Sequence, residues 1–307
     1  MPLKKLSELY EKANKEYYAL GAFNINTLDL IPVILETAEE MESPVIVAST
    51  TQSINFIGID YIMSLINTLS NKIKIPFALH LDHGANFDEV KFAIDNGFTS
   101  VMIDKSHQPF DENVKLTKEV VDFAHSKNIT VEAELGTIGG IEDNVSLDEK
   151  KARLTDPDEA SNFVKKTGCD SLAIAVGTSH GAYKFKGESK LDFDRITKIK
   201  EKLGIPLVLH GASNVIPEML EKCNKYGGRL QGAKGVSDEV LKEAIKRGIN
   251  KVNIDTDIRL TWIATVREIF SNKPEEFDPK NIFGPAYKAI KEIIRKKIIV
   301  LGSAGKA

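Results

Sequence analysis

The 307-residue chain is 42% hydrophobic, which is enough apolar material to bury a large core and argues against disorder. Its 41 Lys and Arg against 44 Asp and Glu give a formal net charge of −3, and without a basic block it lacks the electrostatic footprint of a nucleic-acid-binding protein. The N-terminus does not resemble a signal peptide, and no segment reaches the roughly 20 apolar residues of a membrane span. We therefore expect a cytoplasmic protein with neither a nucleic-acid nor a membrane partner.

Short apolar runs alternate with longer amphipathic stretches along the chain, which is the pattern of parallel strands joined by crossover helices. The eight predicted strands cover residues 19–25, 44–50, 75–83, 99–104, 129–135, 170–178, 205–211 and 249–255. Eight such units favour a closed (β/α)8 TIM barrel of the α/β class over an open doubly wound sheet.

No linker divides the chain, so we expect a single barrel domain over residues 1–307. It includes a helical extension over about residues 279–307, which is predicted to pack on the barrel wall or on a second subunit. The basic residues of this extension are expected to form a solvated face.

Chemically capable side chains end or follow six successive predicted strands. They are Asp82, His83, Asp104, Glu134, His180, His210, Asn253 and Asp255. A single histidine at a strand end is more often structural, but burying so many such groups is costly unless they are paired or bound to metal. Catalytic groups of α/β barrels come from the C-terminal ends of the strands, so this end of the barrel is the predicted active site.

Three of these residues, His83, His180 and His210, suit a catalytic zinc ion, because three neutral imidazoles leave a coordination position open for substrate or water. Asp104 and Glu134 either orient those rings or hold the metal in an alternative place. The residues alone leave both roles open.

The remaining histidines and both cysteines are interpreted as structural. His80 lies two residues before Asp82 on the same strand, so we expect it deeper in the barrel in a hydrogen-bonded packing role. His107 and His125 fall in a loop and at the polar end of a helix. Cys169 and Cys223 form no redox motif and are predicted to be reduced, buried thiols.

Glycines, hydroxyls and backbone N–H groups collect in segments 177–187, 210–214 and 253–256. Barrels often bind phosphate beside their last two strands, where exposed amides meet an anion, so these segments are a candidate phosphate site. Segment 136–144 carries paired glycines and the acids Glu142 and Asp143. It is either a hinged, functional loop or a solvated turn.

Taken together, these motifs resemble the class II, metal-dependent fructose-bisphosphate aldolases, and more closely their shorter branch. HLDHG, SVMID, VEAELG, GGIEDN, GTSHGAYKF, LVLHGAS and KVNIDTD occur in the family order at compatible spacing. The resemblance implies one zinc site, a neighbourhood suited to a second divalent ion, an acid/base group and a proton-transfer carboxylate on a mobile loop. The implied residues are His83, His180 and His210 for zinc, Asp104 and Glu134 for its neighbourhood, Asp82 for acid/base chemistry and Glu142 for the loop.

The resemblance also implies contacts to substrate phosphates and hydroxyls, with a monovalent cation, Na+ or K+, nearby. The matching positions are Thr50, Gly181, Lys184, Gly211, Ser213, Asn253, Asp255 and Thr256. Arg259 matches an arginine that binds phosphate in the shorter branch and reaches a neighbouring subunit's site. This match implies a homo-oligomer, either a dimer or a tetramer. The corresponding arginine of the longer branch falls near Gly284 here, so that contact does not transfer.

The expected reaction is the reversible cleavage of fructose 1,6-bisphosphate to dihydroxyacetone phosphate and glyceraldehyde 3-phosphate, a lyase step of glycolysis and gluconeogenesis. One alternative is a tagatose-1,6-bisphosphate aldolase, although those enzymes tend to carry a histidine where Gly84 stands. A second is a Schiff-base aldolase with Lys251 as the nucleophile. A third is an inactive phosphate-binding scaffold, against which the intact Asp82, Glu142 and three histidines argue.

Overall fold

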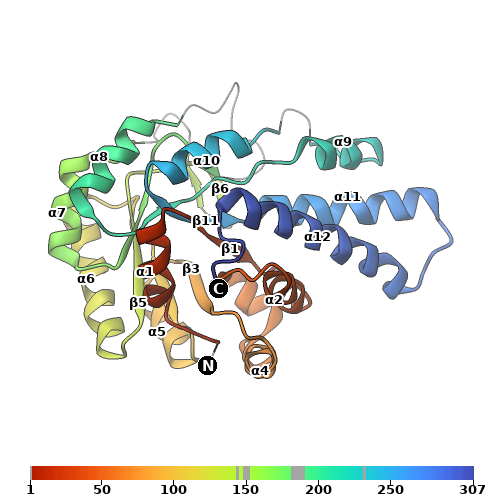
Figure 1. Ribbon diagram of the computed structural model, residues 1–307, viewed down its shortest axis with the longest axis horizontal. Coiled ribbons are helices and arrows are strands. Elements are labelled where there is room, and N and C mark those ends of the chain that lie inside the picture. Colours follow the sequence, from red (N-terminus) through yellow and green to blue (C-terminus); the bar gives the residue numbers. More distant parts are fainter. Residues whose placement is uncertain (1, 143–144, 148–152, 181–190, 231–232) are drawn as a thin grey trace.

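Eight parallel strands close into a barrel in the computed structural model (Figure 1), which confirms the predicted (β/α)8 fold. The structure describes residues 2–142, 145–147, 153–180, 191–230 and 233–307, with the backbone alone for residues 140–142, 145–147 and 180. Each barrel strand falls within or overlaps a predicted one. The strands are β1 (Leu20–Asn24), β2 (Val45–Thr50), β3 (Phe77–Gly84), β4 (Ser100–Ile103), β5 (Thr130–Leu135), β8 (Ser171–Ile174), β10 (Leu207–Leu209) and β11 (Ile249–Ile254).

Helices surround the barrel and bury their apolar faces against the outer sides of the strands. Local sequence explains where several begin, because Asn86, Asp156 and Ser237 each accept a backbone N–H of the first turn. The helices are α1 (Leu6–Glu16), α2 (Leu30–Glu40), α3 (Thr51–Ile57), α4 (Ile59–Ser70), α5 (Phe87–Asp95), α6 (Phe110–Ser126), α7 (Pro157–Thr167), α8 (Phe193–Leu203), α9 (Pro217–Lys225), α10 (Asp238–Lys246), α11 (Thr256–Asn272) and α12 (Pro279–Leu301). None in the described parts of the chain is long and apolar enough to span a membrane.

The N-terminal end of the barrel is closed by α1. Leu6 of this helix is buried in one apolar cluster with Ala22 and Ala78 of the strands. The amide of Ser7 donates to the hydroxyl of Thr130, the first residue of β5, at 3.1 Å. An apolar face of α1 therefore covers the N-terminal end of the barrel.

The C-terminal helix α12 packs against α2, α10, α11 and β1, and Figure 1 shows α11 and α12 running side by side away from the barrel. The expectation that its basic residues form a solvated face is right only in part. Lys291 and Arg295 form ion pairs with acids of α2, but Lys297 is buried. The Lys297 side chain lies between α10 and α11, where Asp238 and Asp257 face it.

A second, three-stranded sheet lies beside the barrel. Its members are β6 (Gly139–Glu142), β7 (Val145–Leu147) and β9 (Ser179–His180). The paired glycines of segment 136–144 therefore lie in a strand, where β6 pairs antiparallel with β7 and parallel with β9. In this register Gly140 lies opposite His180, so the Glu142 segment is held close to a predicted metal ligand.

We expect Ile294→Ala to lower the free energy of unfolding by about 2–5 kcal/mol, because it removes a fully buried side chain and leaves a cavity. Ile299→Ala on the same helix is the matched control, since Ile299 is 60% exposed, and a change within about 0.5 kcal/mol is expected. Urea unfolding measures both. Equal, small effects would show that α12 contributes nothing to the barrel core.

Candidate active site

The imidazoles of His83 and His210 meet at the C-terminal end of the barrel. Nε2 of His83 lies 2.7 Å from Nδ1 of His210, with the ring planes at 85°. His83 has a φ of 48°, at the point where the register between β3 and β4 shifts. A non-glycine residue in the left-handed region costs free energy and persists only where the surrounding structure enforces it. The bulge that this φ creates positions the His83 ring.

The outer nitrogen of each ring is bound to a buried or half-buried carboxylate. Nδ1 of His83 lies 3.0 Å from Asp104 Oδ2, and Nε2 of His210 lies 2.9 Å from Glu132 Oε1. Burial works against the charged form of Asp104, but hydrogen bonds from His83 and the Ser106 amide outweigh it and hold the pKa of this carboxyl below its usual range. A carboxylate behind each histidine favours the tautomer that leaves the inner nitrogen available to bind a metal.

Two groups of side chains within the described residues have ligand atoms that all lie within 4.8 Å of one another. One contains Asp82, His83 and His210, and the other contains His83, Asp104 and Glu134. Oε2 of Glu134 also lies 3.9 Å from Nδ1 of His210. The donor set of imidazoles and carboxylates suits a divalent transition metal.

Four predicted site residues lie wholly or in their side chains outside the described part of the chain. The backbone of His180 ends β9 and that of Glu142 ends β6, while Gly181 and Lys184 are not described. Their predicted roles therefore remain predictions.

Asp82 is clamped by two side-chain amides. Nδ2 of Asn24 donates to its Oδ2 at 2.8 Å, and Nδ2 of Asn253 donates to its Oδ1 at 2.7 Å. All three side chains are buried, so the carboxylate has one orientation. Asn24 was not among the predicted site residues, although it ends β1 and shares inward parity with Ala22, a signal that could have identified it.

A buried ion pair lies deeper in the barrel. Nζ of Lys251 lies 2.8 and 2.9 Å from the two oxygens of Glu132, and Lys251 and the His210 ring together hold the pKa of this carboxyl below its usual range although burial opposes them. His80 accepts from Lys251 at 3.2 Å and binds the Ser100 hydroxyl at 2.9 Å. Burial and the ammonium of Lys251 lower the pKa of His80 to about 3, so it is neutral, and its predicted packing role is confirmed.

This ion pair bears on two sequence interpretations. Glu132 was not among the predicted site residues, although it lies two residues before Glu134 on the same strand and so also points into the barrel. Lys251 was the candidate imine nucleophile, but its amine is fully buried and donates to Glu132. That environment does not present a nucleophile to a substrate.

Cys169 and Cys223 are both buried and are free thiols, as predicted. Burial raises the pKa of the Cys169 thiol to about 12, so it is an inert thiol at neutral pH.

The segments after β10 and β11 lie side by side. Gly211 has a φ of 62°, and a Cβ there would lie 2.6 Å from the carbonyl oxygen of Ser179, so only glycine fits this close approach. The hydroxyl of Ser213 accepts from the amide of Asp255 at 3.4 Å. At the end of β2, two strands from β11 around the barrel, Thr50 pairs in register with Asp82 and caps α3.

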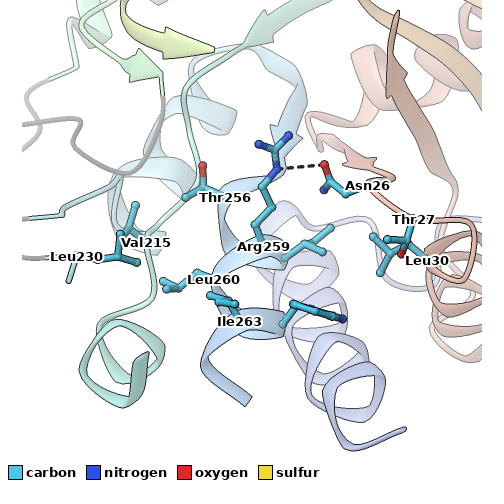
Figure 2. Close-up of a pocket in the computed structure, with 11 residues that line it drawn as sticks. Asn26, Thr27, Leu30, Val215, Leu230, Thr256, Arg259, Leu260 and Ile263 are labelled. Carbon is cyan, nitrogen blue, oxygen red and sulfur yellow. Dashed lines mark hydrogen bonds between the residues drawn. The ribbon is translucent and has the colours of Figure 1, made fainter. Parts of the chain in front are cut away.

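Arg259 lies one turn into α11, beside a cavity of about 470 Å³ that is lined mainly by apolar side chains (Figure 2). Its guanidinium pairs with Asp255 at 2.7 Å, and its Nε donates to Asn26 Oδ1 at 3.1 Å. Thr256 also lines this cavity, but His83 and His210 do not. The cavity therefore adjoins the site without containing these two histidines.

The family model for class II fructose-bisphosphate aldolases matches residues 4–229 and 229–306. The chain belongs to this family. It is 47% identical over 300 residues to a fructose-bisphosphate aldolase of Thermus caldophilus, covering 98% of each chain. It is 45% identical over 310 residues to one of Giardia intestinalis, covering 100% of this chain and 95% of the relative. Among solved structures, the YdjI aldolase of Escherichia coli K12 superposes with a TM-score of 0.81 at 31% identity, covering 99% of both chains.

We expect Glu132→Gln to weaken zinc binding about 10–100-fold, the usual effect of losing a carboxylate behind a ligating histidine. The glutamine oxygen would turn to Lys251 and its amide NH2 to His210, which favours the tautomer with the proton on the inner nitrogen. Competition with a chromophoric chelator measures the affinity. Asp170→Asn is the control, because Asp170 binds His125 at 3.0 Å outside the site, and unaltered affinity in Glu132→Gln would contradict the orientation argued for His210.

Proposed function

We propose that this class II aldolase cleaves fructose 1,6-bisphosphate reversibly to dihydroxyacetone phosphate and glyceraldehyde 3-phosphate, with zinc held by His83, His180 and His210. One observation carries the proposal. Two imidazole nitrogens converge at 2.7 Å, each with a carboxylate behind its ring, beside an aspartate clamped by two amides at the catalytic end of a barrel. The family and its fructose-bisphosphate aldolase relatives support the same reaction.

Asp82 is the acid/base group of the proposed mechanism. Cleavage of the C3–C4 bond requires removal of the proton on the C4 hydroxyl, and a fixed carboxylate near the metal ligands can accept it. Asn24 and Asn253 hold both oxygens of Asp82, so little reorganisation accompanies the transfer. Zinc, when bound, is a Lewis acid that stabilises the negative charge developing on the substrate ketone.

Glu142 transfers the second proton, which belongs to a different carbon of the triose product. Its backbone lies in β6, which pairs with the β9 strand that ends at His180. This pairing supports a position close to the metal ligands. Closure of the segment over substrate remains part of the proposal.

The substrate phosphates are bound by glycine amides, hydroxyls and cations at the ends of the last strands. A monovalent cation, Na+ or K+, accompanies them, and Arg259 acts across a subunit interface in a homo-oligomer, a dimer or a tetramer. Asp104 and Glu134, which gather with His83, serve a second divalent position. The proposed phosphate and hydroxyl contacts are Thr50, Gly181, Lys184, Gly211, Ser213, Asn253, Asp255, Thr256 and Arg259.

We favour fructose over the tagatose epimer. A Cβ at Gly84 would lie 2.5 Å from the backbone oxygen of Met102, so the local geometry of β3 and β4 is built for glycine. The histidine that tagatose enzymes tend to carry at this position would require the strands to shift.

The proposal also includes one catalytic domain over residues 1–307 and a cytoplasmic location.

Removal of the metal tests the reaction. Purified protein is expected to cleave fructose 1,6-bisphosphate, to lose nearly all activity after chelation, and to regain it with zinc, because the metal carries the developing charge. Parallel assays with tagatose 1,6-bisphosphate establish the preferred epimer. Activity that survives complete removal of metal, with borohydride trapping of substrate on a lysine, would instead establish an imine enzyme.

We expect Glu142→Ala to retain zinc and to bind substrate, but to slow exchange of the dihydroxyacetone phosphate proton with solvent by about 10²-fold or more, the usual cost of losing an acid/base group. Proton NMR in deuterated water follows the exchange. Asp143→Ala, which changes the neighbouring acid, is the control. Exchange at the wild-type rate in Glu142→Ala would leave Asp82 to account for both proton transfers.

A further inference from the structure

Lys297 is a buried lysine of α12 to which the proposed mechanism assigns no role. Its side chain is 4% exposed, and its Nζ lies 2.9 Å from Asp238 Oδ1 and 3.4 Å from Asp257 Oδ2. Burying an ammonium is costly unless it is paired. The two aspartates stand in the first turns of α10 and α11, so one lysine from the C-terminal helix joins the starts of two other helices.

Asp257 in turn holds the segment that follows β10. Its Oδ2 accepts the backbone N–H of Asn214 at 3.0 Å, and its Oδ1 accepts that of Val215 at 2.8 Å. Val215 has a φ of 54°, a conformation that is strained for a β-branched residue. Such a conformation persists only where surrounding contacts enforce it, and both oxygens of one buried carboxylate supply that enforcement here.

The same segment is fixed from the side of α10. The amide of Val236 donates to the carbonyl of Ser213 at 3.1 Å. A Cβ at Gly235 would collide with the backbone carbonyls of Ser213 and Asn214. The segment 211–215 is therefore packed between the chain before α10 and the start of α11. Asp257 is also two residues from Asp255, which belongs to the other part of the candidate phosphate site, the segment after β11.

We propose that Lys297 is a positioning residue for phosphate binding: through Asp257 it holds segment 211–215 against segment 255–257, so that both halves of the phosphate site keep one geometry. This inference rests on the proposed function, in which Gly211, Ser213 and Asp255 surround a substrate phosphate. Without the ammonium, the buried carboxylate of Asp257 is left beside the partly exposed carboxylate of Asp238, and their repulsion pushes Asp257 away from the amides of residues 214 and 215. Lys297 acts on the site without touching substrate.

The test compares Lys297→Met with wild type and with Lys291→Met, the matched control from the same helix, whose ion pair with Glu36 lies at the surface. Steady-state kinetics with fructose 1,6-bisphosphate and titration calorimetry with inorganic phosphate are the readouts. We expect Lys297→Met to raise KM and the phosphate Kd by about tenfold while kcat stays within about twofold, because displaced binding groups weaken binding without altering the acid/base groups. Lys291→Met is expected to match wild type in all three.

A second variant separates positioning from stability. Combining Lys297→Met with Asp257→Asn removes the unpaired charge of Asp257, so we expect the melting temperature to recover relative to Lys297→Met. The asparagine offers only one carbonyl oxygen to the two amides of residues 214 and 215. We therefore expect KM and the phosphate Kd of the double variant to remain raised. If either folded variant binds phosphate as wild type does, Lys297 has a structural role only and the inference is wrong. Wild-type protein that binds phosphate but fails to cleave the substrate would overturn the proposed function instead, and the phosphate titrations would still decide the role of Lys297.

Discussion

The active site depends on how the barrel accommodates charge in its interior. Lys251 and Glu132 are fully buried and neutralise each other at 2.8 Å, and removing one partner of such a pair typically costs about 3–5 kcal/mol. Glu132 also binds the outer nitrogen of His210. One carboxylate therefore compensates a buried cation and orients a candidate metal ligand, so the charge balance of the core and the geometry of the site cannot be varied separately.

Two strained backbone positions lie at the same end of the barrel as the active site. His83 and Val215 both adopt positive φ without being glycine, and each is enforced by neighbouring structure. The register shift between β3 and β4 accompanies the first, and the carboxylate of Asp257 holds the second. The opposite end is sealed by the apolar contacts of α1. The strained conformations of His83 and Val215 are thus held by contacts at the end of the barrel that carries the candidate site.

The C-terminal helix links these two aspects. Its Ile290, Ile294 and Ile298 join the hydrophobic core around the barrel. Lys297 reaches the starts of α10 and α11 beside the candidate phosphate site. A single element therefore contributes apolar burial, surface ion pairs with α2 and a buried ion pair near its end. Because α12 packs beside α10 and α11, Lys297 lies close to the segments that follow β10 and β11.

The sequence by itself determined the barrel, its eight strands and the end at which the site lies, because periodicity of two in strands and about 3.6 in helices is a local property. It also placed Asp82, His83, Asp104 and His210 at strand ends, where the structure brings them together. Only the tertiary structure decided which groups these residues contact. Asn24 meets Asp82, Glu132 meets Lys251, and Lys297 meets Asp257, and the two residues of each pair are 40 or more positions apart in the sequence. Such pairings follow from barrel closure and helix packing, which set distances that no local pattern encodes.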